Sequence, residues 1–257
     1  MSYALVTGAS KGIGRSITSA LARRGFAVLL VARSAPALQE EADRLKKEYK
    51  VETDWLAIDL TNYGATQTIF EWCMKKKYEV SVLVNNAGYG LSGPFEKYTL
   101  DEQQNMMQLN MIVPVELCRR FLPLLHTQPK AYILNIASTA AYQAVPNLSL
   151  YAATKAFILT FSRGLRQELH GSNISVTCVS PGSTDTDFVV RAQLGEKGLK
   201  TAKKVNMTAD TVADIAVRSM LAGKAEVIIG MINKLGAFFV WLLPKGLVER
   251  TAMKIYE

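Results

Sequence analysis

Tyr151 and Lys155 stand four residues apart in the segment YAATK, which puts both side chains on one face of a helix. A free tyrosine has a pKa of about 10 and is a poor proton carrier at neutral pH. A lysine ammonium close by favours the phenolate and lowers that pKa, so that the hydroxyl can exchange a proton with a substrate. Ser138 precedes Tyr151 by thirteen residues and can direct a second hydroxyl at the same substrate oxygen. The pattern predicts acid–base chemistry at that oxygen.

The stretch TGASKGIG, residues 7–14, holds three glycines near the start of the chain. Glycine is favoured where the backbone turns tightly or where another molecule approaches closer than a Cβ would allow. The apolar run before this stretch and the helical spacing of IGRSITSALARRG after it predict a strand, a turn and a helix. The free N–H groups at the start of such a helix favour an anion, and a pyrophosphate fits best.

Arg33 and Ser34 follow the second apolar run, at a place where an NAD-binding site usually carries an acidic residue for the ribose 2′-hydroxyl. A guanidinium attracts the 2′-phosphate that a carboxylate would repel. Lys11, inside the glycine loop, adds a second positive charge, and Ser10 adds a hydroxyl donor. The sequence therefore favours NADP(H) over NAD(H). The alternative is that Lys11 and Arg33 are merely exposed cations.

The elements that must position these residues are short apolar runs that alternate with helical segments. Five of the runs lie at residues 27–31, 54–58, 81–85, 131–137 and 174–180. Such a pattern predicts an α/β fold, with a doubly wound parallel sheet of the Rossmann type in a three-layer α/β/α sandwich. Ligands bind at the carboxyl ends of the strands in these sheets. Asp59, the stretch NNAG at 85–88 and the stretch SPGSTDT at 180–186 are expected there.

The composition bounds the class of protein. A chain of 257 residues with 49% hydrophobic and 20% charged residues suits a single domain, expected to span 1–257. The first strand is expected from about Tyr3, which leaves no space for a signal peptide and predicts a cytoplasmic protein. The net charge of +8 is spread along the chain without interleaved aromatic residues, so we expect a solvated surface and no nucleic acid.

The cysteines and histidines complete this picture. Cys73, Cys118 and Cys178 are expected to be buried thiols, because they are odd in number and set in apolar surroundings. His126 and His170 are expected on the surface near helix ends, and two histidines are too few for a metal cluster. The sequence therefore predicts no metal site.

The order of these motifs closely resembles that of the short-chain dehydrogenase/reductase family. The set comprises TGASKGIG, NNAG, Asn110 in MMQLNM, Ser138, YAATK and PGSTDT, and the resemblance runs from about Ser2 to Met220. It implies an oxidoreductase in which Tyr151 is the general acid or base and Ser138 polarises the carbonyl. Lys155 would lower the tyrosine pKa and hold the nicotinamide ribose, and Asn110 would order a water that relays protons to Lys155.

The same resemblance implies a cofactor site. It assigns Asp59 to the adenine, Asn85, Ala87 and Gly88 to the ribose and cofactor backbone, and Thr184 and Thr186 to the nicotinamide amide. The family often has Ile or Val in place of Thr184, but that contact uses the backbone. The complete set expected to bind NADP(H) is Thr7, Gly8, Ser10, Lys11, Gly12, Ile13, Gly14, Arg33, Ser34, Asp59, Leu60, Asn86, Ala87, Gly88, Tyr151, Lys155, Pro181, Gly182, Thr184 and Thr186.

Two rival functions remain beside hydride transfer to a carbonyl or from an alcohol. An epimerase or dehydratase of the extended branch of the family needs an added domain, for which the chain is too short, and the spacing G-x-x-x-G-x-G matches the shorter branch. A non-catalytic NADPH-binding sensor or interaction protein commonly lacks one of the four catalytic residues, and all four are present here. A homodimer or homotetramer is expected.

Two segments lie outside the matched motifs. Residues 183–206 are expected to form a lid over the substrate, as in the family. The tail, residues 231–257, contains the apolar run LGAFFVWLL at 235–243, which is too short to span a bilayer. We favour packing in the core or against another subunit for this run, then a wall of an apolar substrate pocket, and last an anchor on a membrane surface.

Overall fold

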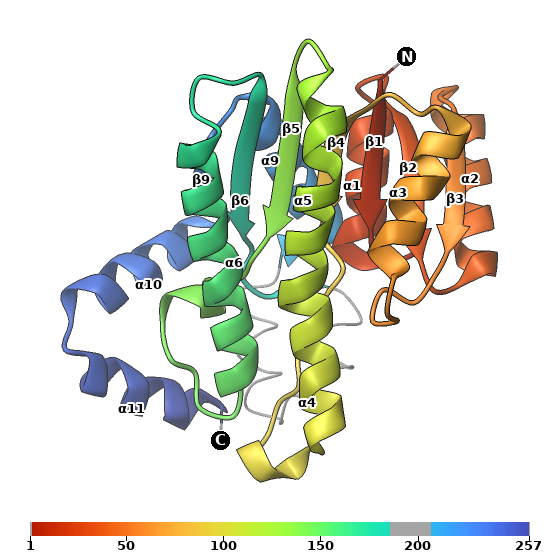
Figure 1. Cartoon of the computed structure of the whole chain (residues 1–257). Coiled ribbons are helices and arrows are strands. Elements are labelled where there is room, and N and C mark those ends of the chain that lie inside the picture. Colours follow the sequence, from red (N-terminus) through yellow and green to blue (C-terminus); the bar gives the residue numbers. More distant parts are fainter. Residues whose placement is uncertain (1, 186–206, 257) are drawn as a thin grey trace.

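A parallel sheet runs through the middle of the molecule (Figure 1). The computed structural model describes residues 2–185 and 207–256. Within them, seven strands pair in the order β3-β2-β1-β4-β5-β6-β9, and all neighbours are parallel. The strands are β1 (Tyr3–Thr7), β2 (Ala27–Ala32), β3 (Thr53–Ala57), β4 (Val80–Asn85), β5 (Ala131–Ile136), β6 (Ile174–Ser180) and β9 (Glu226–Ile228). The doubly wound sheet predicted from the sequence is confirmed.

Helices cover both faces of this sheet (Figure 1). One face carries α1 (Gly12–Ala22), α2 (Ala35–Tyr49) and α9 (Ala209–Leu221). The opposite face carries α3 (Ala65–Lys76), α5 (Val113–His126) and α6 (Ser149–Glu168). Strands β1, β2, β4 and β5 are buried along almost their whole length, because each packs against a helical layer on both sides.

Short elements follow the carboxyl ends of the strands. They comprise the 3₁₀ helices η1 (Phe95–Lys97) and η3 (Thr139–Tyr142), helix α4 (Leu100–Met107), the single π-helical turn η2 (Gln108–Ile112), and the two-stranded pair of β7 (Thr184–Asp185) and β8 (Met207–Thr208). Strand order reverses between β1 and β4, so the chain leaves these two neighbours toward opposite faces of the sheet. The reversal opens a crevice at their carboxyl ends, where α/β sheets bind their ligands.

A buried carboxylate fastens the helices of the first layer to each other. Glu41 of α2 is only 1% exposed and accepts hydrogen bonds from Arg15 Nε at 2.7 Å and from Thr18 Oγ1 at 2.9 Å, both on α1. Arg44 donates to both oxygens of the same carboxylate, to Oε1 at 2.7 Å and to Oε2 at 2.9 Å. A buried charge needs this degree of pairing, so the cluster fixes α2 behind the loop that leads into α1.

The last two helices, α10 (Met231–Leu242) and α11 (Lys245–Tyr256), extend away from the sheet (Figure 1). No residue of α10 is buried. The preferred expectation for the run at 235–243 was packing in the core or against another subunit. The structure does not place this run in the core of the chain. No helix among the described residues is long and apolar enough to cross a membrane.

The expected burial of the cysteines and exposure of the histidines are confirmed. Cys73, Cys118 and Cys178 are free and buried, and His126 and His170 are exposed at the end of α5 and just after α6. Strand β9, in contrast, was not foreseen. Its three residues are only partly buried at the edge of the sheet, so they carry too weak a hydrophobic pattern to stand out.

Candidate active site

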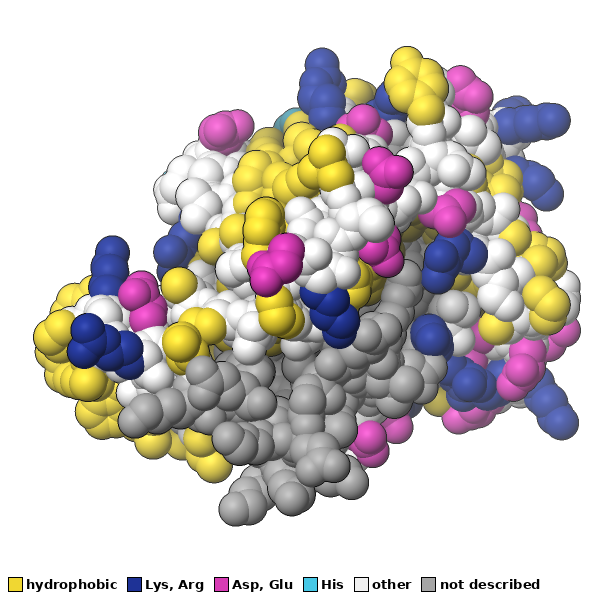
Figure 2. All heavy atoms as spheres, turned by 90° about the horizontal axis from the view of Figure 1, so that it is seen from below, with side chains coloured by type: hydrophobic (Ala, Val, Ile, Leu, Met, Phe, Trp, Pro, Cys, Tyr) yellow, Lys and Arg dark blue, Asp and Glu magenta, His cyan; other side chains and the backbone are white. Residues whose placement is uncertain are grey.

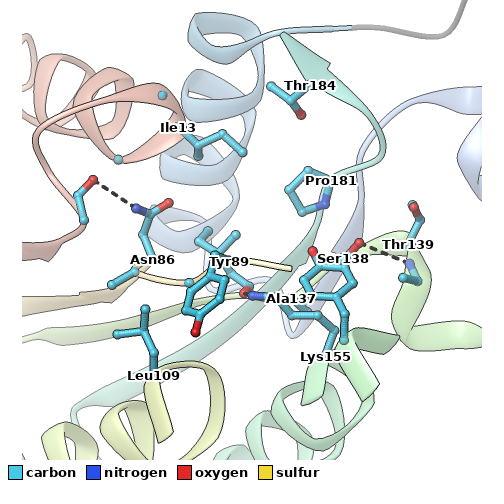
Figure 3. Close-up of a pocket in the computed structure, with 18 of the residues that line it drawn as sticks. Ile13, Asn86, Tyr89, Leu109, Ala137, Ser138, Thr139, Lys155, Pro181 and Thr184 are labelled. Atoms are coloured by element: carbon cyan, nitrogen blue, oxygen red, sulfur yellow. Dashed lines mark hydrogen bonds between the residues drawn. The ribbon is translucent and has the colours of Figure 1, made fainter. Parts of the chain in front are cut away.

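A cavity of about 610 Å³ opens at the carboxyl ends of the strands. Figure 3 shows Ile13 and Asn86 on one side of this space and Ser138 and Lys155 on the other, with Pro181 and Thr184 at its border. The predicted site residues that line the cavity are Gly8, Ser10, Lys11, Gly12, Ile13, Gly14, Arg33, Asp59, Leu60, Asn86, Ala87, Gly88, Ser138, Tyr151, Lys155, Pro181, Gly182 and Thr184. Segments far apart in the sequence therefore converge on one site.

The glycine loop turns into α1 in a way that side chains would block. Gly8 has φ +68°, a conformation that costs other residues energy. A Cβ on Gly14 would lie 2.1 Å from the Gly8 carbonyl oxygen, so the first turn of α1 packs directly on the loop. The first turn of α1 has no acidic residue, and no side chain caps the N-terminus of the helix. This helix end offers its N–H groups to the cavity, as an anion-binding cradle requires.

Thr7 and Asn86 hold this loop to the end of β4. The Thr7 hydroxyl donates to the Val84 carbonyl at 3.1 Å and accepts from the N–H groups of Asn86 at 3.0 Å and Ala87 at 3.1 Å. The Asn86 amide donates back to the Thr7 carbonyl at 2.9 Å. Thr7 is itself buried and does not line the cavity. Thr7 therefore supports the glycine loop from behind instead of facing the cavity.

Arg33 lies at the outer end of the cavity beside Asp59. The guanidinium Nη1 is 3.8 Å from the Asp59 carboxylate, and the Arg33 side chain is 62% exposed. Most of its donors therefore still face solvent. Lys11 lines the same cavity. Ser34, which was also expected to bind cofactor, does not line it and instead immediately precedes α2.

Tyr151 and Lys155 lie on α6 with their side chains buried to 7% and 6% exposure. The Lys155 Nζ atom is 5.9 Å from the centre of the Tyr151 ring and donates to the Ile136 carbonyl at 3.0 Å. Burial lowers the pKa of the Lys155 ammonium to about 8, because a charged group loses its hydration inside the protein. The two side chains meet as the i, i+4 spacing predicted.

Ser138 follows β5 and begins η3. Its hydroxyl oxygen accepts from the Ala140 N–H at 3.1 Å, which fixes the side chain at the cavity wall. That bond leaves the hydroxyl proton available as a donor.

Asn110 sits in the π-helical turn η2 and is 1% exposed. Its amide oxygen accepts from the Tyr89 N–H at 3.1 Å, and its amide nitrogen donates to the Tyr89 carbonyl at 2.9 Å and to Thr154 Oγ1 at 3.1 Å. Asn110 does not line the cavity. A Cβ on Gly88 would meet the Asn110 oxygen at 2.9 Å and Lys155 Nζ at 3.4 Å, so both groups approach this one glycine.

Of two more expected cofactor residues, one lies away from the cavity and the other is not described by the structure. Asn85 is 5% exposed and donates to Asn135 Oδ1 at 2.8 Å inside the sheet, so it does not reach the cavity. Thr186 lies outside the described residues, as does most of the expected lid at 183–206. Of that lid, the structure describes Ser183, Thr184 and Asp185 before the gap, and Ser183 and Thr184 line the cavity.

Several wall residues were missed by the sequence. The Tyr142 hydroxyl donates to Glu226 at 2.6 Å and lies 3.2 Å from Ser180 Oγ, and burial together with the Glu226 carboxylate raises the pKa of Tyr142 above its usual range. Asn233 of α10 packs so closely on Gly182 that a Cβ there would lie 2.4 Å from its amide nitrogen. Neither residue belongs to a local motif. Tyr142 binds Glu226 of β9, and Asn233 itself lies on α10, so both contacts depend on the far end of the chain.

Comparisons with known proteins agree with this geometry. A family model described as short chain dehydrogenase matches residues 2–197, and the chain belongs to that family. A very-long-chain 3-oxoacyl-CoA reductase of Danio rerio is 36% identical over 183 residues, which cover 70% of this chain and 57% of that protein. The chain thus matches little more than half of this relative's length.

Two solved structures share the fold. A short-chain dehydrogenase from Sphingobium yanoikuyae in complex with NADPH superimposes with a TM-score of 0.82 at 29% identity, covering 96% of this chain and 94% of the other. A 7β-hydroxysteroid dehydrogenase superimposes with a TM-score of 0.87 over 98% of this chain and 96% of the other. Its identity of 22% supports likeness of the fold alone.

Proposed function

We propose that this chain is an NADPH-dependent reductase of an apolar carbonyl compound, with the reverse oxidation following the same path. The observation that carries the proposal is the convergence of Ser138, Tyr151 and Lys155 on the cavity into which the glycine loop and the N-terminus of α1 open. The family membership supports an oxidoreductase.

The residues fit a dinucleotide. Gly8 and Gly14 leave room where a Cβ would collide with backbone, and the uncapped end of α1 suits a pyrophosphate. Arg33 and Lys11 would hold the 2′-phosphate, while Asp59 and Leu60 border the adenine end. The NADPH complex of the Sphingobium relative supports this choice of cofactor. When bound, NADPH supplies the hydride.

The chain's own residues then handle the oxygen of the substrate. Ser138 donates its hydroxyl proton to the carbonyl oxygen and polarises the bond. Tyr151 gives the phenolic proton to the oxygen as negative charge develops there, acting as the general acid. Lys155 favours the phenolate that remains, and it would hold a ribose hydroxyl of the bound cofactor. Asn110, held by Tyr89 and Thr154, acts from behind Gly88 by fixing the wall next to Lys155.

The substrate end of the cavity is largely apolar, which supports an apolar carbonyl. The apolar residues that line it include Leu109, Val145 and Leu148, together with Ala237 and Val240 of α10. Apolar contact stabilises a ligand by about 25 cal/mol per Å² buried. The Danio relative is named for very long acyl chains, which agrees with this class of substrate.

The proposal also includes the expectations that the protein is catalytic, cytoplasmic and oligomeric. A non-catalytic NADPH sensor has no observation in its favour, because Ser138, Tyr151 and Lys155 all line one cavity. Three free, buried cysteines suit a cytoplasmic protein. Sedimentation analysis tests for the homodimer or homotetramer.

Replacement of Tyr151 by Phe tests the proposal. The variant lacks the proton donor and little else, so turnover of a ketone panel should fall at least a hundredfold while NADPH affinity, read by nucleotide fluorescence, changes less than threefold. Tyr98→Phe, which removes a phenol bound to the Ser92 carbonyl outside the cavity, is the matched control. If Tyr151→Phe kept more than a tenth of the activity, Tyr151 would not be the acid.

A further inference from the structure

Helix α10 presents two different faces. Asn233, Gly236, Ala237 and Val240 lie on one side of the helix and line the cavity. Met231, Leu235, Phe238 and Leu242, spaced three or four residues apart, lie on the opposite side, which we call the outer face of α10. The four side chains of the outer face are 51 to 70% exposed. The helix therefore turns one side toward the cavity and leaves its other, apolar side exposed to solvent.

Further apolar side chains extend the outer face. Trp241 is 80% exposed and Phe239 is 50% exposed, and the Phe238 ring packs against each of them at centroid distances of 6.1 and 5.9 Å. Leu243 and Leu247 continue the apolar surface into α11. Figure 2 shows hydrophobic side chains gathered at this end of the molecule, beside Lys or Arg side chains. Contiguous apolar surface of this kind marks an interaction site.

The charges around the outer face narrow the choice of partner. Lys234, Lys245 and Arg250 are exposed here, and Glu249 is the one acidic residue between 231 and 253. A two-fold dimer through this face would set two copies of the same net positive patch against each other. Lysine is also depleted from the cores of protein interfaces. An anionic surface would satisfy these charges.

We propose that the outer face of α10 docks on an anionic lipid bilayer, lying in the plane of its surface. Exposed tryptophan, phenylalanine and leucine with flanking lysine and arginine are the residues that interfacial helices use. The other face of α10 lines the cavity, so an apolar substrate dissolved in the bilayer would meet the pocket beside the docked helix. The docking stands on the exposed surface and does not depend on the proposed reaction.

Flotation of the full chain with lipid vesicles tests the docking. The wild-type chain should float with phosphatidylcholine vesicles that contain phosphatidylserine, and less with phosphatidylcholine alone or at high salt. Phe238→Glu with Trp241→Glu should lower the affinity for the mixed vesicles by about a hundredfold, since each large apolar side chain contributes about tenfold. Unchanged NADPH binding shows that this variant is folded, because neither residue lines the cavity.

The controls isolate the outer face. Tyr63→Glu with Met74→Glu makes the same change of charge at two exposed apolar residues near α3 and should leave flotation unchanged. Lys234→Gln with Lys245→Gln keeps the apolar residues and should remove the preference for phosphatidylserine. The proposal is overturned if the wild-type chain does not float, or if the outer-face variant floats equally well. It is also overturned if the chain is a dimer without lipid that this variant dissociates, since the face is then a subunit interface.

Discussion

Lys155 carries a buried ammonium whose energetic cost can be measured. Its side chain is 6% exposed, and its Nζ donates to the Ile136 carbonyl at 3.0 Å. Burial lowers the pKa to about 8 from the ordinary 10.5. A shift of this size corresponds to about 3 kcal/mol, at about 1.4 kcal/mol for each pKa unit. Lys155→Met keeps the length and apolar stem of the side chain but removes the charge.

The sign of the effect follows from proton linkage. Below pH 8 the lysine is protonated in both the folded and the unfolded chain, so the folded state bears the full cost of burying the charge. Between pH 8 and 10.5 the unfolded chain holds more protons, and the stability of the wild type rises with pH. The methionine variant lacks this titration. At pH 7 it should be more stable by about 2 kcal/mol, because the lost hydrogen bond returns about 1 kcal/mol.

Urea unfolding of the cofactor-free proteins at intervals from pH 7 to 10.5 measures this difference. The advantage of Lys155→Met should shrink steadily through that window, while turnover is lost at every pH. Lys46→Met, at an exposed lysine of α2, controls for the removal of any positive charge. The reasoning fails if Lys155→Met is the less stable protein at pH 7, or if the gap does not narrow as the pH rises.

Three further predictions use other parts of the structure. Arg33→Ala should weaken NADPH binding by about ten- to a hundredfold, the contribution of one charge-assisted hydrogen bond, and should leave NADH binding unchanged. Equal losses of affinity for both cofactors in a fluorescence titration would show that Arg33 does not bind the 2′-phosphate. Glu41→Gln should lower the free energy of unfolding, measured in urea, by about 3 kcal/mol, because Arg15 and Arg44 lose the buried carboxylate that they share. A loss below about 1 kcal/mol would show that solvent screens the charges of this cluster. KM should fall along a graded series of longer, more apolar ketones, and a flat series would contradict an apolar substrate end.

Local motifs predicted many of the residues that line the cavity. The glycine loop lines the cavity at Gly8, Gly12 and Gly14, and the pair in YAATK meets on α6. In both cases a few consecutive residues contain the whole pattern: a strand, turn and helix in one, and an i, i+4 pair in the other. The strands were predicted for the same reason, because buried parallel strands are almost unbroken apolar runs.

For three of the predicted site residues that do not line the cavity, the reason is the direction in which their side chains point. Thr7 and Asn85 stand at strand ends beside true cavity residues, but both turn into the sheet, where they bind Val84 and Asn135. The Asn110 side chain likewise forms hydrogen bonds with Tyr89 and Thr154. A polar residue next to a ligand site and one that braces the backbone behind it have the same sequence pattern.

The amino-acid sequence by itself determined the layered α/β fold, the glycine loop and the tyrosine–lysine pair, since periodicity and short spacing are properties of neighbouring residues. Only the tertiary structure decided what surrounds them. Packing against β5 buries Lys155 and sets its pKa, and the edge strand β9 supplies Glu226 to Tyr142. The apolar spacing of α10 fits a core helix, a pocket wall and a docking face equally well. Which side is covered depends on where the rest of the chain lies, and here α10 covers the cavity with one face and exposes the other.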